Sequence, residues 1–228
     1  MKPYDWLLFD LDNTILDFTA SSEIAFNALM KEMGYFIEAD DFKTYRIINR
    51  QVWTDMEAGL LDHKALKTRR WSLFFAERQI EFDPVKANQI YFEYIKTSPV
   101  FVSFAKELLE LCKDNFKMSI ITNGIAEVQW PRIDQTGLRD YFEHIVISDE
   151  LGVAKPHHDY FDHCHQLLDR PKKSRVLVIG DTAESDINGG KAYGYDTCWY
   201  NPEYRSEKNV ETNFQIRHLK ELRSILSL

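Results

Sequence analysis

The feature that most constrains the fold of this chain is an apolar run that ends in two aspartates. Residues 6–9 are uninterrupted apolar residues, and Asp10 and Asp12 follow them. Such a run is typical of a strand buried on both faces of a sheet, and open parallel α/β sheets bind ligands at the carboxyl ends of their strands. Side chains two apart on an extended chain point the same way, so the two carboxylates would need a cation or a proton between them. The competing interpretation is a plain turn, in which Asp and Asn are ordinary turn formers.

Beyond residue 99 the pattern of the chain favours a parallel sheet. Short apolar runs predict strands over 117–122, 144–148, 175–180 and 196–200. Amphipathic spacing predicts helices over 101–113, 125–136, 160–168, 184–193 and 216–227. Strictly alternating strands and helices predict an α/β fold, a doubly wound parallel Rossmann-like sheet with helices on both faces.

Between the first strand and the rest of the sheet lies a long stretch with helical character. Residues 21–97 contain no convincing buried strand, and Asp83 followed by Pro84 is typical of a helix start. A stretch of this length is too long for one crossover connection. We therefore expect an α/β core domain formed by residues 1–16 and 99–228, and an inserted α-helical cap domain formed by residues 17–98.

Composition and charge limit the classes of molecule that this protein is expected to bind. The chain has 228 residues, 44% of them hydrophobic, and a formal net charge of −8, which argues against a nucleic-acid polymer or an anionic membrane as a partner. A small anionic substrate in a locally positive pocket stays compatible with this charge. The three scattered cysteines and the lack of a signal-peptide pattern predict a cytoplasmic protein. The sequence leaves both a monomer and a homodimer open.

Polar residues follow each of the central predicted strands. Because parallel strands share a carboxyl edge, these residues are expected to converge on one crevice. Besides Asp10 and Asp12, the group comprises Thr122, Asn123, Gly124, Lys155, Asp181 and Asp186.

This set suits the transfer of a phosphoryl group from a monoester. Clustered carboxylates bind Mg²⁺, and the metal and Lys155 can offset the charge of phosphoryl oxygens. Thr122 and the backbone at Asn123 and Gly124 can donate hydrogen bonds to those oxygens. One carboxylate can attack phosphorus, and a second can protonate the leaving oxygen and then deprotonate water.

Each member of the set also has a simpler interpretation. Lys155 before Pro156 could be a surface lysine, and Thr122-Asn123-Gly124 could be only a turn. Asp181 could cap a helix, and Asp186 could be a solvated helix residue. The order of all four at successive strand ends favours the functional interpretation.

That order resembles the four-motif signature of the haloacid dehalogenase (HAD) superfamily. The resemblance implies that Asp10 is the nucleophile and Asp12 the general acid/base. It implies that Thr122 and Lys155 hold the phosphoryl group and that Asp186 is a supporting acid. It implies an Mg²⁺ site formed by Asp10, the backbone carbonyl of Asp12, and Asp181. Thr14 would pin the loop after the first strand.

A narrower resemblance is to the bacterial HAD-type pyrimidine 5′-nucleotidases. It is carried by residues 121–124, 136–142, 153–156, 180–187 and 197–199, and in the insertion by 49–53 and 57–59. It implies a Mg²⁺-dependent phosphomonoesterase that acts on nucleoside 5′-monophosphates, with pyrimidines preferred. Among the aromatic residues of the insertion that could stack on a base (Tyr45, Trp53, Trp71 and Phe74), Trp53 is favoured as the substrate contact.

Three alternatives remain open at this point. A sugar-phosphate phosphatase of the same superfamily, such as one acting on N-acylneuraminate 9-phosphate, would share the site. A haloacid dehalogenase would need no acid for a leaving oxygen, so the presence of Asp12 argues against it. A phosphoacceptor signalling module is conceivable because the third strand ends in Ser148-Asp149-Glu150, but it would have no use for the insertion.

Overall fold

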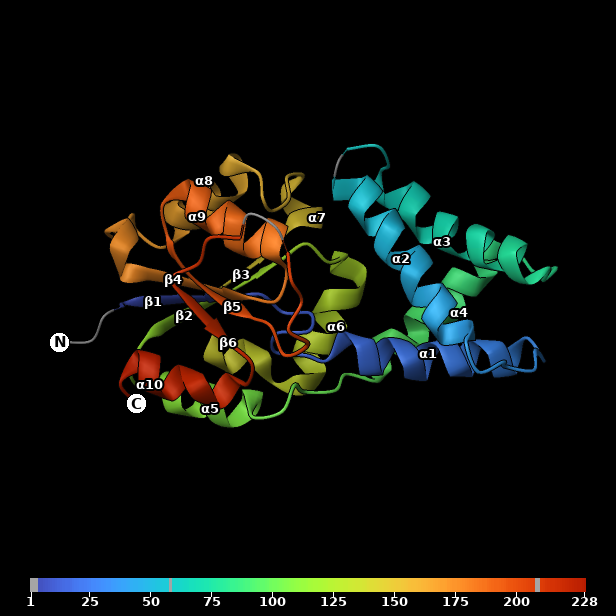
Figure 1. The fold of residues 1–228 in the computed structure, drawn as a ribbon, viewed down its shortest axis with the longest axis horizontal. Coiled ribbons are helices and arrows are strands. Elements are labelled where there is room, and N and C mark those ends of the chain that lie inside the picture. The colour runs from blue at the N-terminus through green and yellow to red at the C-terminus, as the bar shows by residue number, and fades with distance from the viewer. Residues whose placement is uncertain (1–3, 58, 208–209) are drawn as a thin grey trace. The chain divides into compact units, whose positions relative to one another are not determined.

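The computed structural model describes residues 4–57, 59–207 and 210–228, and the chain divides into two compact units. The first unit comprises Met1–Phe18 and Val100–Leu228, and the second comprises Thr19–Pro99. The first contains a sheet flanked by helices, whereas the described residues of the second form helices and connecting loops (Figure 1). That the helical unit serves as a cap stays a prediction.

A six-stranded sheet forms the centre of the first unit, and all its neighbouring strands pair in parallel. Its strand order is β3-β2-β1-β4-β5-β6. The strands are β1 (Trp6–Phe9), β2 (Lys117–Thr122), β3 (His144–Ile147), β4 (Val176–Gly180), β5 (Asp196–Tyr200) and β6 (Phe214–Ile216). The predicted parallel α/β sheet is therefore confirmed.

Helices cover both faces of this sheet. They are α5 (Ala105–Cys112), α6 (Ala126–Thr136), α7 (Ser148–Leu151), α8 (His158–Leu167), α9 (Gly189–Tyr193) and α10 (Leu222–Leu226). The unit also contains the 3-10 helices η1 (Leu138–Tyr141), η2 (Lys173–Arg175) and η4 (Leu219–Glu221), and the π-helix η3 (Ala183–Asn188).

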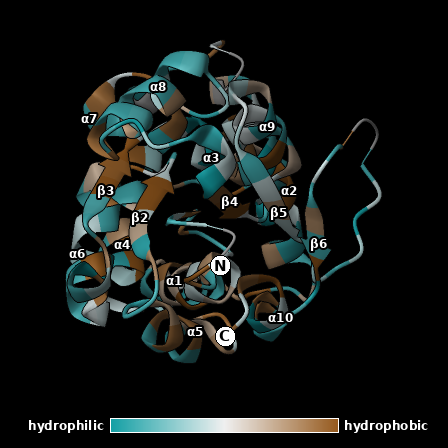
Figure 2. Ribbon diagram, turned by 90° about the vertical axis from the view of Figure 1, so that its left-hand side faces the viewer, coloured by the Kyte–Doolittle hydropathy of each residue, from teal (hydrophilic) through white to brown (hydrophobic). Residues whose placement is uncertain are grey.

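Strand β1 shows how the sequence divides the core between the two faces. Leu7 and Phe9 belong to a hydrophobic cluster with residues of α5, α6 and α10. Trp6 and Leu8 belong to a second cluster with residues of α8. Alternate side chains of a strand point to opposite faces, so a strand buried on both faces must be apolar throughout. The hydrophobic colour of β2 and β3 in Figure 2 reflects the same requirement.

The expected helix over residues 216–227 is wrong at its start. Phe214–Ile216 form the edge strand β6, which pairs with β5 from Cys198 to Tyr200. The backbone groups of β5 on that side would otherwise lack strand partners, and this pairing satisfies them. The helical part of the tail is limited to η4 and α10. The helix expected over 184–193 is divided as well, into the π-helical η3 and α9.

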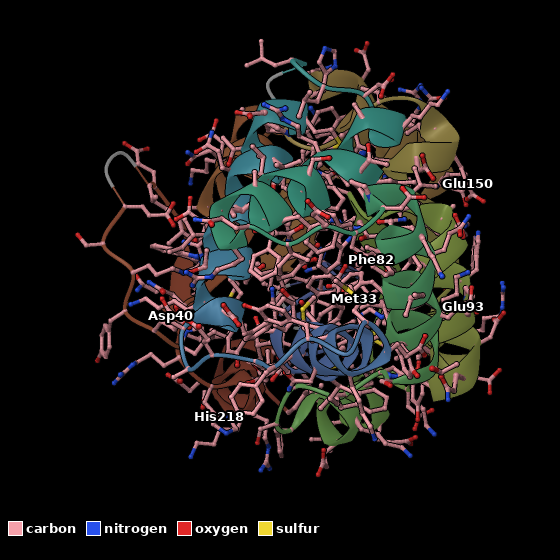
Figure 3. All side chains as sticks on the ribbon, turned by 90° about the vertical axis from the view of Figure 1, so that its right-hand side faces the viewer. Met33, Asp40, Phe82, Glu93, Glu150 and His218 are labelled. Carbon is pink, nitrogen blue, oxygen red and sulfur yellow. The ribbon has the colours of Figure 1, made fainter. Side chains whose placement is uncertain are left out.

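The helical unit consists of α1 (Phe18–Glu32), α2 (Asp41–Glu57), α3 (His63–Arg78) and α4 (Pro84–Thr97). Asp62 and Asp83 cap α3 and α4 by accepting backbone N–H bonds, at 2.6 Å and 2.9 Å. Aromatic side chains from all four helices fill its interior, while Asp40 and Glu93 are exposed at its surface (Figure 3). Among the described residues of the whole chain, no helix is both long and apolar enough to cross a bilayer.

The register of the sheet brings three strand ends to one edge. Phe9, the last residue of β1, lies opposite Ile120 of β2 and Ile179 of β4. Asp10 therefore lies next to the carboxyl ends of both neighbouring strands, where Thr122 and Gly180 are found. The fold places the chain's clustered polar residues at the edge where parallel sheets bind ligands.

Candidate active site

A buried ammonium group links two of the predicted carboxylates. Lys155 Nζ donates to Asp10 Oδ1 at 2.8 Å, to Asp186 Oδ1 at 2.6 Å and to the Ile121 carbonyl at 2.8 Å. These three contacts use all three donors of the ammonium group. Its side chain is 1% exposed, so the interpretation of Lys155 as a surface lysine is wrong. Although burial alone lowers the pKa of a lysine, the carboxylates of Asp10 and Asp186 raise the pKa of Lys155 above its ordinary value.

Asp181 completes an acidic cluster at the same edge. One carboxylate oxygen from each of Asp10, Asp181 and Asp186 lies within 4.8 Å of the others. Arg205 Nη2 lies 3.3 Å from Asp181 Oδ2. Asp186 also packs against Gly180 so closely that a Cβ there would lie 2.3 Å from Asp186 Oδ2. Only glycine leaves room for this carboxylate at the end of β4.

The mutual repulsion of the carboxylates in this cluster favours a bound cation. Burial raises the pKa of Asp10 well above its ordinary value, and the charges of Asp186 and Asp181 raise it further despite Lys155. Burial and Asp186 raise the pKa of Asp181 to about 7, against the opposing effect of Arg205. Hard carboxylate oxygens at this spacing are the donor set that Mg²⁺ prefers. The residues therefore fit a divalent cation, and the assignment of Asp10 and Asp181 as its ligands stays a prediction.

We expect Mg²⁺ to stabilise the protein more near pH 8 than near pH 5. The pKa of Asp181 is raised in the folded state, so the folded protein binds this proton more tightly than the unfolded chain. The contribution of Asp181 to stability is then present below about pH 4 and is lost as the pH rises to about 7. A cation on the ionised carboxylates offsets the loss. Melting temperatures measured across this range with EDTA or with Mg²⁺ give the comparison.

The matched control is Asp181→Asn, which removes the titrating group. It should flatten the pH dependence of the EDTA-treated protein and weaken the response to Mg²⁺. A wild-type response to Mg²⁺ that is equal at both ends of the range would contradict the expectation.

The hydroxyl group of Thr122 can act as a hydrogen-bond donor. Its Oγ1 accepts the Gly124 backbone N–H at 3.1 Å and Gln129 Nε2 at 2.9 Å. A hydroxyl has two acceptor lone pairs and one proton. Because both lone pairs are occupied, the proton is left for another acceptor, such as an oxygen of a phosphoryl group.

Asp12 is held by two residues of α6 that the sequence did not single out. Arg132 Nη1 donates to Asp12 Oδ1 at 2.7 Å, and Gln129 Nε2 donates to Asp12 Oδ2 at 2.8 Å. The spacing of 129 and 132 on one helix face was the available signal, because residues three apart on a helix are neighbours. Without the fold, the two side chains look like part of a solvated face.

Asn123 positions the backbone of Lys155. Its Nδ2 donates to the Lys155 carbonyl at 2.8 Å, and its Oδ1 accepts the Lys155 N–H at 2.9 Å. The side chain of Asn123 therefore joins the end of β2 to the loop that carries Lys155. A contact between its backbone and substrate stays a prediction.

For the remaining candidate residues, the structure gives less direct evidence of a role in the site. Thr14 is buried, but its hydroxyl has no hydrogen-bond partner among the described residues, and backbone bonds such as Ile15 N–H to the Leu11 carbonyl hold the loop. Asn13 adopts a positive φ of 61°, which suits the turn-forming role expected of it. Trp53 belongs to α2 of the helical unit and is half-buried, whereas Tyr45 and its aromatic neighbours are core residues. A role for Trp53 in substrate binding stays a prediction.

At the carboxyl edge of its parallel sheet, the chain combines carboxylates, a buried lysine and a hydroxyl donor, a set suited to phosphoryl transfer. The family model for haloacid dehalogenase-like hydrolases matches residues 4–194, and the chain belongs to that family. The resemblance seen in the sequence is thereby confirmed.

Individual relatives match nearly the whole chain. The pyrimidine 5′-nucleotidase YjjG of Escherichia coli is 36% identical over 224 residues, which are 98% of each chain. The pyrimidine 5′-nucleotidase PynA of Streptococcus pneumoniae is 34% identical over 88% of this chain and 85% of its own length. The HAD-hydrolase YfnB of Bacillus subtilis has a crystal structure with bound magnesium that superimposes with a TM-score of 0.93, at 31% identity and full coverage of both chains.

Proposed function

We propose that the protein is a Mg²⁺-dependent phosphomonoesterase that dephosphorylates nucleoside 5′-monophosphates, with pyrimidines preferred. The observation that carries the phosphatase part is the buried cluster of Asp10, Lys155 and Asp186 beside Asp181, with Asp12 and Thr122 at the same sheet edge. The similarity to two pyrimidine 5′-nucleotidases supports the nucleotide part.

The first half-reaction transfers the phosphoryl group to Asp10. Lys155 holds Asp10 Oδ1, which assigns the attack on phosphorus to Oδ2. A bond forms between Oδ2 and phosphorus, and the bond from phosphorus to the ester oxygen breaks. Asp12 gives its proton to the departing oxygen, which leaves as an alcohol.

The second half-reaction releases phosphate. Asp12, now ionised, takes a proton from a water molecule whose oxygen attacks phosphorus. The bond between phosphorus and Asp10 breaks, and the Asp10 carboxylate is restored. Throughout, the Thr122 hydroxyl donates to a phosphoryl oxygen. When bound, Mg²⁺ held by Asp10, the Asp12 carbonyl and Asp181 would supply positive charge against the phosphoryl oxygens.

We assign substrate selection to the helical unit. Trp53 is half-buried on α2, while Tyr45, Trp71 and Phe74 are fully buried in the aromatic interior of the unit. Of the four candidates, Trp53 therefore keeps ring surface for a base. In YfnB, the magnesium-bound crystal form reveals interdomain movement, which supports movement of the helical unit relative to the core unit in this protein.

Phosphate release across a panel of monoesters tests the proposal. In the presence of Mg²⁺, we expect kcat/KM for pyrimidine nucleoside 5′-monophosphates to exceed that for sugar phosphates by at least about tenfold, since ligand stacking on an aromatic ring contributes about 1–3 kcal/mol per base. EDTA should abolish turnover. Trp53→Leu should raise KM for nucleotides and leave KM for sugar phosphates unchanged.

The panel distinguishes the remaining possibilities. Equal or better turnover of N-acylneuraminate 9-phosphate or another sugar phosphate would refute the nucleotidase proposal and favour a sugar-phosphate phosphatase. Halide release from a haloacid without turnover of any phosphate ester would refute the phosphatase proposal itself.

A further inference from the structure

Arg132 is a buried cation whose position is explained by Asp12. The side chain of Arg132 is 0% exposed, and its Nη1 lies 2.7 Å from Asp12 Oδ1. Its guanidinium also lies over the ring of Phe18, with 5.4 Å between Cζ and the ring centroid. A buried charge is costly unless it is paired and hydrogen-bonded, and Asp12 supplies the carboxyl group that pairs with this guanidinium.

The amide of Gln129 has only one orientation that satisfies its neighbours. Gln129 Oε1 accepts from Arg132 Nη1 at 2.7 Å. The two protons of Gln129 Nε2 are then left for Asp12 Oδ2 at 2.8 Å and Thr122 Oγ1 at 2.9 Å. The flipped amide would place an acceptor against the carboxylate of Asp12 and a donor against the guanidinium.

A glycine makes room for this amide. A Cβ on Gly124 would lie 2.1 Å from Gln129 Nε2, closer than real contacts allow. The same Gly124 donates its backbone N–H to Thr122 at 3.1 Å. The small residue after β2 therefore lets Gln129 reach both Thr122 and Asp12 from α6.

We propose that Gln129 and Arg132 are positioning residues that fix Asp12 relative to Thr122. Through Gln129, the group assigned to move the proton and the group assigned to hold the phosphoryl oxygens are joined into one hydrogen-bonded unit. Arg132 fixes the other oxygen of Asp12 and the orientation of the Gln129 amide. The inference rests on the proposed phosphatase function, and it concerns residues that act through Asp12 and Thr122.

A double-mutant cycle with two leaving groups tests the inference. We expect Gln129→Leu and Arg132→Met each to lower kcat/KM for an alkyl phosphate ester by about 10-fold to 100-fold, part of the 10²–10⁴-fold worth of a general acid. The loss should be clearly smaller for 4-nitrophenyl phosphate, because 4-nitrophenolate departs without a proton. In an Asp12→Asn background, Arg132→Met should not lower kcat/KM for the alkyl ester further, and Gln129→Leu should lower it less than in the wild-type protein, because Gln129 also contacts Thr122.

The matched control is an arginine in η1, the turn that follows α6. Arg139 follows α6 and forms an exposed ion pair with Asp134 of α6, and Arg139→Met should leave both rates unchanged. Melting temperature and Mg²⁺ binding by calorimetry establish that each variant is folded and retains its metal site. Should Arg132→Met fail to fold, Gln129→Leu provides the same comparison, because its smaller change leaves the ion pair in place.

The outcomes separate the two proposals. Equal losses for both esters, losses that add fully to that of Asp12→Asn, or wild-type rates in Gln129→Leu would overturn the positioning role while the phosphatase function stands. A wild-type protein that turns over neither ester overturns the proposed function, and the positioning role with it.

Discussion

Asp10→Asn is expected to reduce phosphomonoester turnover by at least about 10⁴-fold, as expected for loss of a covalent nucleophile. An amide is a poor nucleophile and a weaker metal ligand than a carboxylate. The substitution keeps the size of the side chain and an oxygen that can accept from Lys155, which lies 2.8 Å from Asp10 Oδ1. The variant should therefore fold. Phosphate release with enzyme in excess of substrate measures the remaining rate.

The control for this prediction is Asp149→Asn, which tests the phosphoacceptor alternative. Asp149 follows the third strand, and its Oδ2 accepts the backbone N–H of Ala126 at 3.0 Å, a contact that an Asn oxygen can keep. Asp149→Asn should retain turnover. If Asp10→Asn kept more than about one per cent of the wild-type rate, Asp10 would lose its assignment as nucleophile.

Lys155→Met is expected to abolish activity and to lower the free energy of unfolding by about 3–5 kcal/mol, the usual cost of removing one partner of a buried ion pair. Methionine matches the length of the stem but leaves Asp10 and Asp186 without their shared cation. The Ile121 carbonyl would lose its donor as well. Denaturant unfolding in EDTA measures the loss without a contribution from a bound metal.

A second substitution separates charge from packing. Adding Asp186→Asn to Lys155→Met removes one of the two stranded charges, so it should recover part of the lost stability without restoring activity. Lys113→Met, which removes an exposed ion pair with Glu110, should leave stability and turnover unchanged. If Lys155→Met were as stable as the wild-type protein, the buried ammonium would not be the counter-charge described above.

The sheet was predictable because its strands are buried on both faces. Buried residues predominate in a strand of this kind, and the runs at 117–122 and 196–200 coincide with β2 and β5 as the structure has them. The short edge strand β6 was not predictable, because three residues with an exposed centre carry almost no periodic signal. Its pairing with β5 depends on the tertiary structure.

The residues of the candidate site also include some that were predictable from the sequence and some that were not. Residues next to strand ends, such as Asp10 and Thr122, were predictable, because parallel strands place their carboxyl ends at one edge. Gln129 and Arg132 were not, because their spacing on one helix face does not by itself distinguish a residue that contacts a remote carboxylate from one that contacts water. Arg132 meets Asp12 across 120 positions of sequence.

The central claim is that a phosphoryl group passes through Asp10, and trapping the acyl phosphate tests it most directly. Enzyme quenched during turnover of a pyrimidine nucleoside 5′-monophosphate is reduced with borohydride, which converts an aspartyl phosphate to homoserine, and the digest is examined by mass spectrometry. We expect homoserine at position 10 in the wild-type protein and none in Asp10→Asn. Homoserine at position 149, or rapid turnover without any reduced aspartate, would contradict it.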